Sequence, residues 1–241
     1  MRVSIIVPAF NEEKLIGATL RRIGAASAAF SRRGWESEVI VCDNNSTDTT
    51  AAQAREAGAK VVFEPVNQIA RARNTGAGAA AGGWLVFVDA DSRPSVELFD
   101  DVAGQIEGGR CVGGGSTMRL DERRFLTGCL MWLSNWFSRI IHWAAGAFVF
   151  CEKRAFDALG GFSLELYASE EIDFSRKLKK LARREGRKVV ILHRYPLETS
   201  ARKMRLYSRA ELLAFTFRAL FRPVRTVKSR EACHPWYDGR R

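Results

Sequence analysis

The chain has 241 residues, of which 46% are hydrophobic, and it can bury a sizeable core as one domain or as one domain with a tail. Its formal net charge of +11 favours anionic partners such as nucleotides or anionic lipid. No nucleic-acid-binding signature is present, so we expect no nucleic acid partner. Five scattered cysteines without a C-x-x-C pair argue against disulfides or a zinc site and favour reduced thiols in a cytosolic protein.

The N-terminal region predicts a strand, a sharp turn and a helix. Residues 3–7 form the apolar strand, and the chain enters it directly, without the cleavage pattern of a signal peptide. Asn11 suits the N-cap of the helix, with Glu12 and Glu13 in the first turn. The turn lacks the G-x-G-x-x-G motif of a dinucleotide-binding fold, which argues against an oxidoreductase.

A second strand is predicted at residues 38–42, and it stops at Asp43. Asn44 and Asn45 follow, and asparagine tolerates the left-handed conformation of a tight turn. Ligands of open α/β sheets bind at the carboxyl ends of parallel strands. We therefore interpret Asp43 as a ligand contact, and its alternative role is that of a turn former.

A third strand at residues 61–63 precedes an Ala- and Gly-rich helix that begins near Gln68. Small residues let such a helix pack closely on a sheet. Arg71 and Arg73 lie near its start, where they either meet a phosphate group or are simply solvated.

Residues 84–88 predict a strand that is buried on both faces, and two carboxylates follow it at Asp89 and Asp91. Side chains alternate along a strand, so both carboxylates point the same way if the strand continues. Such a pair suits Mg²⁺ or Mn²⁺ completed by substrate phosphates. Alternatively, the two residues cap the next helix, around Ser95, and the spacing alone does not decide between these interpretations.

The alternation of strands and helices predicts an α/β fold with a mostly parallel central sheet flanked by helices. Four motifs in this order resemble a family 2 glycosyltransferase. The resemblance implies a GT-A fold with a Rossmann-like nucleotide-binding half in residues 1–200, followed by a basic helical tail in residues 201–241. The motifs are Val7-Pro8-Ala9-Phe10-Asn11-Glu12-Glu13, Val41-Cys42-Asp43-Asn44-Asn45-Ser46-Thr47-Asp48, Ala72-Arg73-Asn74-Thr75-Gly76 and Asp89-Ala90-Asp91.

The same resemblance implies roles in binding a nucleoside diphosphate sugar. Pro8, Ala9 and Glu12 line the donor site, Asp43 pairs with the base, usually uracil, and Arg73 lies near the nucleotide or its diphosphate. We also expect Arg202, which follows the last predicted strand, to reach the diphosphate.

A divalent cofactor, Mg²⁺ or Mn²⁺, is implied as well. Asp91 binds this metal directly, and Asp89 contacts the metal or the ribose. His193 ends a predicted strand at residues 189–192 and either completes the metal shell or packs without a function.

The second half of the chain resembles the acceptor side of the same family. Gly160-Gly161-Phe162 and the later run Glu170-Glu171-Ile172-Asp173-Phe174 match its acceptor block. Glu171 occupies the position of the catalytic base, and Glu170 is the alternative.

Two apolar stretches bear on the membrane. Residues 125–150 contain Arg139 and His142, so they do not form a clean membrane span. They predict a core helix, and the alternative is an amphipathic helix that lines an acceptor pocket or lies at a membrane surface. Residues 204–221 interleave large apolar residues with arginines and predict a basic helix, which either binds an anionic membrane surface or packs on the domain.

Together these features predict an inverting glycosyltransferase that moves a sugar, expected from a UDP-sugar, to the hydroxyl of a saccharide or lipid-linked acceptor. We expect a role in cell envelope glycan or glycolipid synthesis, in the cytoplasm or at the cytoplasmic face of the membrane. The alternative is a glycosyltransferase-like protein that binds nucleotide sugar or a partner without turnover. A sugar-nucleotide pyrophosphorylase is disfavoured because the first turn lacks a Gly-rich, Arg-containing loop.

Overall fold

The computed structural model of the protein describes residues 1–121, 135–136, 138–140, 144, 146–202, 226–233 and 237. The predicted basic helix at residues 204–221 and most of the apolar stretch at residues 125–150 lie outside them, so both stay predictions. In the part that is described, no helix has the length and hydropathy needed to cross a membrane. The elements are β1 (Arg2–Ala9), α1 (Ile16–Ala26), α2 (Ala28–Ser31), β2 (Glu36–Asp43), α3 (Thr50–Glu56), β3 (Lys60–Phe63), α4 (Ile69–Gly78), β4 (Trp84–Val88), β5 (Ser92–Arg93), α5 (Val96–Glu107), β6 (Cys111–Leu120), β7 (Phe148–Glu152), α7 (Lys153–Ala158), α8 (Glu170–Arg184) and β8 (Lys188–Thr199).

The described strands form one eight-stranded sheet in the order β3-β2-β1-β4-β7-β6-β8-β5. The first four strands of this order are parallel, β7 is antiparallel to both β4 and β6, and β8 is parallel to β6. The predicted α/β fold with a mostly parallel sheet is confirmed. Because β1, β2 and β4 are parallel, their carboxyl ends meet at one edge of the sheet.

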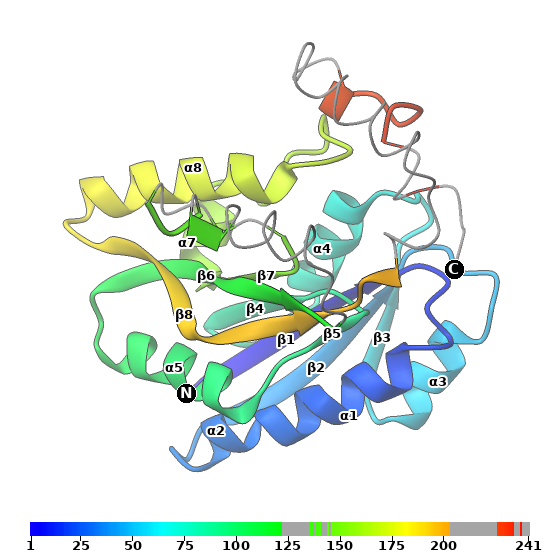
Figure 1. Ribbon diagram of the computed structural model, residues 1–241, viewed down its shortest axis with the longest axis horizontal. Coiled ribbons are helices and arrows are strands. Elements are labelled where there is room, and N and C mark those ends of the chain that lie inside the picture. The colour runs from blue at the N-terminus through cyan, green and yellow to red at the C-terminus, as the bar shows by residue number, and fades with distance from the viewer. Residues whose placement is uncertain are drawn as a thin grey trace.

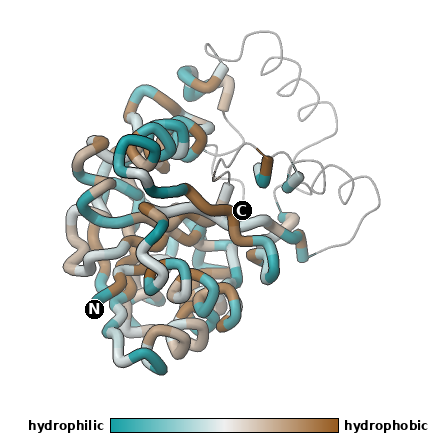
Figure 2. Tube along the Cα trace, turned by 90° about the vertical axis from the view of Figure 1, so that its left-hand side faces the viewer, coloured by the Kyte–Doolittle hydropathy of each residue, from teal (hydrophilic) through white to brown (hydrophobic). Residues whose placement is uncertain are grey.

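Alternate side chains of β1 enter two separate cores, one on each face of the sheet. Ile5 packs with residues of α1, α2, α3 and α5, whereas Ile6 packs with residues of α4, α7 and α8. Figure 1 shows these two groups of helices on opposite sides of the strands. In Figure 2 hydrophobic segments run through the interior and hydrophilic ones lie at the periphery. The sheet is therefore covered on both faces, and its edge at the strand ends stays available for a site.

All five residues of β4 are buried, as predicted for a strand at the centre of a parallel sheet. The strand ends at Val88, and Ser92 N donates to Asp89 O at 3.0 Å, so Asp89 and Asp91 lie in a turn. Ser95 caps α5 itself, since its side chain accepts a hydrogen bond from Leu98 N. The interpretation of the two aspartates as helix caps is therefore wrong.

Asn11 does not cap α1, which begins five residues later at Ile16. Its backbone is left-handed, with φ 52°, and its side chain Oδ1 accepts a hydrogen bond from Thr47 N at 2.8 Å. The residue therefore fastens the turn after β1 to the turn after β2. The left-handed asparagine predicted in that second turn is confirmed at Asn45, with φ 66°.

Helix α4 packs closely on β1 through a glycine, as its small residues predict. A Cβ atom at Gly76 would lie 2.5 Å from Cγ2 of Ile6. The same helix carries Arg73, so this close packing determines where the guanidinium of Arg73 lies relative to the sheet.

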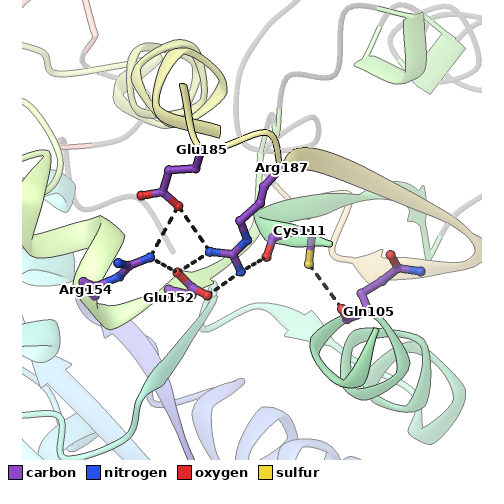
Figure 3. Close-up of polar contacts among 6 residues, drawn as sticks. All are labelled: Gln105, Cys111, Glu152, Arg154, Glu185 and Arg187. Atoms are coloured by element: carbon purple, nitrogen blue, oxygen red, sulfur yellow. Dashed lines mark hydrogen bonds and ion pairs between the residues drawn. The ribbon is translucent and has the colours of Figure 1, made fainter. Parts of the chain in front are cut away.

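The end of α8 is fastened to β7 by a group of ionic contacts (Figure 3). Arg187 Nη1 donates to Glu152 Oε2 at 2.9 Å, and Arg187 also donates to the backbone carbonyl of Cys111. Arg154 Nη2 lies 3.3 Å from Glu185 Oε2. Because α8 is fixed to the sheet at this end, the location of its acidic first turn is constrained as well.

We expect Gly76→Ala to lower the free energy of unfolding by about 1–3 kcal/mol, because the added methyl group overpacks the contact with Ile6. Gly104→Ala in α5 is the matched control, since a Cβ atom there meets no heavy atom within 4 Å. The control should raise the free energy of unfolding by about 0.5–1 kcal/mol, because alanine favours the helix. Urea unfolding measures both changes, and equal changes in the two variants would contradict the packing argument.

Candidate active site

The first of two adjoining pockets lies where β1, β2 and β4 end. It brings together four predicted donor-site residues, Pro8, Ala9, Glu12 and Asp89, with the predicted metal ligand Asp91. A pocket at this edge is expected for an open α/β sheet, in which ligands bind outside the carboxyl ends of the strands. Its full lining is Pro8, Ala9, Phe10, Glu12, Asn44, Asn67, Ile69, Asp89, Ala90, Asp91 and Tyr237.

Asp43 lies beside this first pocket and does not line it, whereas its neighbour Asn44 does. Asp43 is buried, and its Oδ1 accepts a hydrogen bond from Ser46 N at 3.1 Å, as a turn former does. In the part of the chain that the structure describes, its second oxygen receives no hydrogen bond. Asn44 is held by Val66 O and Gln68 N, at 2.7 and 2.9 Å, so this corner of the pocket is rigid.

Glu12 connects the first pocket to the end of β8. Arg202 Nη2 lies 2.8 Å from both oxygens of Glu12, and the two side chains are 12% and 8% exposed. Glu12 N also donates to Thr50 Oγ1 at 2.7 Å. Arg202 was predicted to reach the diphosphate. In the structure its guanidinium lies beside the first pocket, where it pairs with the carboxylate of Glu12.

The second pocket is lined by residues of α4, of the turn after β4 and of the segment that leads into α8, together with Gly146. Its cation is Arg73, whose side chain is only 3% exposed. Arg73 Nη1 lies 2.6 Å from Glu170 Oε1, and Arg73 Nη2 lies 2.9 Å from Asp89 Oδ1. Asp89 lines both pockets, so they adjoin at this carboxylate. The second pocket is lined by Ile69, Arg73, Asp89, Gly146, Tyr167, Ala168, Ser169, Glu170 and Glu171.

Glu170 and Glu171 begin α8 and face different partners. Glu170 is 2% exposed and bonds Arg73, whereas Glu171 Oε1 accepts a hydrogen bond from Gly146 N at 3.3 Å. Consecutive helical residues differ in direction by about 100°, which explains the separation. Both carboxylates line the second pocket, so the structure brings the two candidate bases to it.

Burial perturbs the acid–base properties of this pair. Burial and, to a smaller extent, the charge of Glu171 raise the pKa of Glu170 to about 8, although Arg73 opposes both effects. Burial also raises the pKa of Glu171, and Arg73 again opposes it. Since Asp89, Glu170 and Glu171 face one guanidinium, the pair retains a proton at a higher pH than an ordinary carboxyl does.

Asp89 and Asp91 are suited to hold a divalent ion. Among the residues that the structure describes, no group of three or more His, Cys, Asp or Glu side chains could hold a metal. Mg²⁺ needs no such group, because one or two carboxylates usually hold it together with water and substrate phosphates. Two carboxylates in one pocket thus fit an ion that binds together with a phosphate.

His193 does not join the two aspartates, so its predicted metal role is corrected here. Its side chain is exposed on β8. Along β6 the partner of Leu192 lies four residue steps from the partner of Thr199, which corresponds to about 13 Å of strand. It is the far end of β8 that approaches the site, where Ser200 N donates to Asp91 O at 3.2 Å.

Several pocket residues were missed by the sequence analysis. Ser169 has a left-handed backbone directly before α8, with φ 63°, and serine gives no signal of such a conformation. Gly146, with φ 93°, donates its N–H to Glu171, and a glycine within a run of bulky apolar residues was a signal that could have identified it. Ile69 and Tyr237 carry no pattern that distinguishes them from core residues.

The fold is shared with solved glycosyltransferases. The structure of S. aureus TarS 1-349 in complex with UDP-GlcNAc is 20% identical, with a TM-score of 0.65, over 98% of this chain and 69% of that one. The mannosyltransferase PcManGT from Pyrobaculum calidifontis, in complex with GDP-Man and Mn²⁺, is 20% identical, with a TM-score of 0.62, over 99% and 73% of the two chains. Mycobacterium tuberculosis glucosyl-3-phosphoglycerate synthase, with Mn²⁺, UDP-Glc and phosphoglyceric acid, is 16% identical, with a TM-score of 0.62, over 97% and 80%. At these identities the similarity shows the GT-A fold alone.

Curated relatives match shorter regions. An uncharacterized glycosyltransferase of Mycobacterium tuberculosis is 37% identical over 89 residues, which are 37% of this chain and 36% of the relative. The dodecaprenyl-phosphate galacturonate synthase of Rhizobium johnstonii is 39% identical over 56 residues, which are 23% and 16% of the two chains. The matched regions thus span about a third or less of these relatives. The model of the glycosyl transferase family 2 matches residues 4–155, which include most of β1, β2 through β7, all but one of the residues that line the first pocket and four of the nine that line the second. The chain belongs to glycosyl transferase family 2.

Proposed function

We propose that the protein transfers a sugar from a nucleoside diphosphate sugar in the first pocket to an acceptor hydroxyl in the second. One observation carries this proposal: Asp89 lines both pockets. The carboxylates of the turn after β4 therefore adjoin the carboxylates at the start of α8. A group transfer requires that donor and acceptor sites meet at the reacting atoms. Family membership supports the same reaction.

The donor is proposed to be a UDP-sugar. Asp43 has a carboxylate oxygen without a donor in the described residues, and such an oxygen suits the N–H of a uracil ring. Asn44 lines the pocket next to it. Solved structures of the same fold hold UDP-sugars or GDP-mannose, so the choice between bases is left to experiment.

Asp91 and Asp89 are proposed to hold Mg²⁺ or Mn²⁺ together with the diphosphate. When bound, such an ion stabilises the negative charge of the departing diphosphate. Two solved structures of this fold contain Mn²⁺ with a nucleotide sugar, which supports the assignment. In the protein itself, Glu12 lines this pocket, and its ion pair with Arg202 holds a guanidinium beside the pocket, where it would favour a bound anion.

Glu171 is proposed as the general base. A base must be free to accept the proton of the acceptor hydroxyl. Glu170 bonds Arg73 at 2.6 Å in a buried position, whereas the carboxylate of Glu171 has, among the described residues, only a 3.3 Å contact with Gly146 N. The difference favours Glu171 for the base and a positioning role for Glu170.

The reaction is proposed to invert the anomeric configuration in a single displacement. The diphosphate leaves from the first pocket, and the base acts from the second, so attack and departure occur on opposite faces of the sugar. No covalent sugar–enzyme intermediate is then needed. The acceptor is proposed to be a saccharide or a lipid-linked hydroxyl at the cell envelope. A lipid acceptor is in keeping with the relative that is named as a dodecaprenyl-phosphate galacturonate synthase.

Nucleotide binding tests the donor and metal assignments together. UDP-sugars with Mn²⁺ should raise the melting temperature more than GDP- or ADP-sugars do, because a ligand that binds the folded state stabilises it. Asp91→Asn should lose this metal-dependent increase, whereas Asp101→Asn in α5 is the control that should keep it. Equal stabilisation in excess chelator would contradict the metal assignment. Unchanged ranking and affinity in Asp43→Ala would contradict the assignment of the base.

Kinetics distinguish the two glutamates. Glu171→Gln should lower the rate of sugar transfer by at least ~100-fold, the low end for a positioned base, with little change in donor binding. Glu170→Gln should have a smaller effect. Asp173→Asn is the control on the same turn, since Asp173 pairs only with Lys177 among the described residues. A larger loss in Glu170→Gln would reverse the assignment, and no loss in either would refute the catalytic role of this turn.

The raised pKa of Glu170 predicts a pH dependence of stability. Between the ordinary pKa of 4.5 and about 8, the folded state keeps a proton that the unfolded state releases. The stability that this proton provides is therefore complete below pH 4.5 and is lost as the pH rises towards 8. Subtracting the unfolding free energy of Glu170→Gln from that of the wild type should give a difference that falls across this range. A difference that rises with pH would show that the ion pair with Arg73 lowers the pKa of Glu170 by more than burial raises it.

A further inference from the structure

The chain's C-terminal segment, defined as residues 226–233 together with Tyr237, packs on the loop that leads into α8. Tyr167 N donates to Val227 O at 2.7 Å, and Lys228 Nζ lies 2.6 Å from Glu165 Oε2. Figure 1 shows residues 226–233 beside this loop, at the end of α8 that carries the acidic turn. The C-terminal segment, which lies about 60 residues after this loop in the sequence, thus packs against the loop and supports the start of α8.

Tyr237 carries this segment to the first pocket. Its side chain is buried, its hydroxyl donates to Tyr167 O at 2.8 Å, and its ring meets the Tyr167 ring edge-on at 5.6 Å between centroids. It packs with Ala168 and Cys233, and it is also one of the residues that line the first pocket. Because its hydroxyl already donates a hydrogen bond to a backbone carbonyl, we infer that the ring of Tyr237 is the part that a ligand in the pocket would contact.

The loop beneath Tyr237 is tied to both pockets. Gln68 Nε2 donates to Leu164 O and Leu166 O, at 2.9 and 3.0 Å, and Gln68 N donates to Asn44 Oδ1. Ala168 and Tyr167 line the second pocket, two to four residues before the acidic turn. The Tyr237 hydroxyl bond therefore joins a wall of the first pocket to the loop that sets the start of α8.

We propose that Tyr237 is a specificity-determining residue of the donor pocket, whose ring contacts the bound nucleoside diphosphate sugar and whose hydroxyl positions the loop before α8. This inference rests on the function proposed above. The ring contact contributes to donor affinity, since an aromatic face packs on a base or on the apolar face of a sugar. The hydroxyl contributes to turnover, because the loop holds the acidic turn against the second pocket.

Binding of UDP with Mn²⁺, measured by calorimetry on the full chain, tests the ring. Tyr237→Leu keeps an apolar side chain in the cluster, and it should weaken binding at least ~5-fold, the lower end for an aromatic stacking contact. Tyr237→Phe keeps the ring and should bind as the wild type does. Tyr195→Ala is the control, since Tyr195 is an exposed tyrosine of β8, and it should leave binding unchanged.

Steady-state kinetics test the hydroxyl. Tyr237→Phe should lower kcat several-fold while the donor KM stays constant, and unchanged kcat would overturn the positioning role. Wild-type affinity in Tyr237→Leu would overturn the ring contact. If Tyr237→Leu melts well below the wild type, an affinity loss that is absent from Ile106→Ala, a destabilising core substitution in α5, still supports the contact. A wild-type chain that binds neither UDP nor GDP with Mn²⁺ would overturn the proposed function as well, whereas binding that is indifferent to Tyr237 overturns this inference alone.

Discussion

One buried guanidinium holds the two halves of the site together. Arg73 bonds Asp89, at the end of β4, and Glu170, at the start of α8, from a helix that packs on β1. Removal of one partner of a buried ion pair typically costs about 3–5 kcal/mol, because the remaining charge stays buried without compensation. The spacing between Asp89 of the first pocket and the carboxylates of the α8 turn therefore depends on this one side chain. The resemblance placed Arg73 near the nucleotide or its diphosphate, which stays a prediction; in the structure each of its terminal nitrogens contacts a carboxylate.

The fold was largely predictable because its signals are local. The five buried residues of β4, the small residues of α4 and the order of the four motifs each depend on a few neighbouring residues. The gathering of Asp89, Asp91 and Glu12 also followed, since parallel strands end at one edge of the sheet. The expected cause was wrong, however. Asp89 and Asp91 line the same pocket because they lie in one turn, and not because side chains alternate along a strand.

The long-range pairs could not be predicted from such signals. Arg73 and Glu170 are 97 residues apart, and Glu12 and Arg202 are 190 apart, so no periodicity relates them. The metal role of His193 was predicted wrongly for a related reason. From Leu192 to Leu197 the chain advances by five residues along β8, whereas β6 advances by only two, so the register between the two strands is interrupted. The end of a predicted strand at residue 192 was therefore not the end of β8, which runs on to Thr199 and reaches the site there.

The charge of the site differs from that of the chain as a whole. The overall charge is +11, yet the described residues that line the two pockets supply more carboxylates than guanidiniums, even with Arg202 included. A diphosphate is itself strongly anionic, so it would enter such a site against repulsion unless a cation accompanied it. Protonation of the Glu170–Glu171 pair relieves only part of this excess. Charge balance therefore favours a donor that arrives with a divalent ion, and it does so independently of the motif that first suggested a metal. The groups concerned are the carboxylates Glu12, Asp89, Asp91, Glu170 and Glu171 and the guanidiniums Arg73 and Arg202.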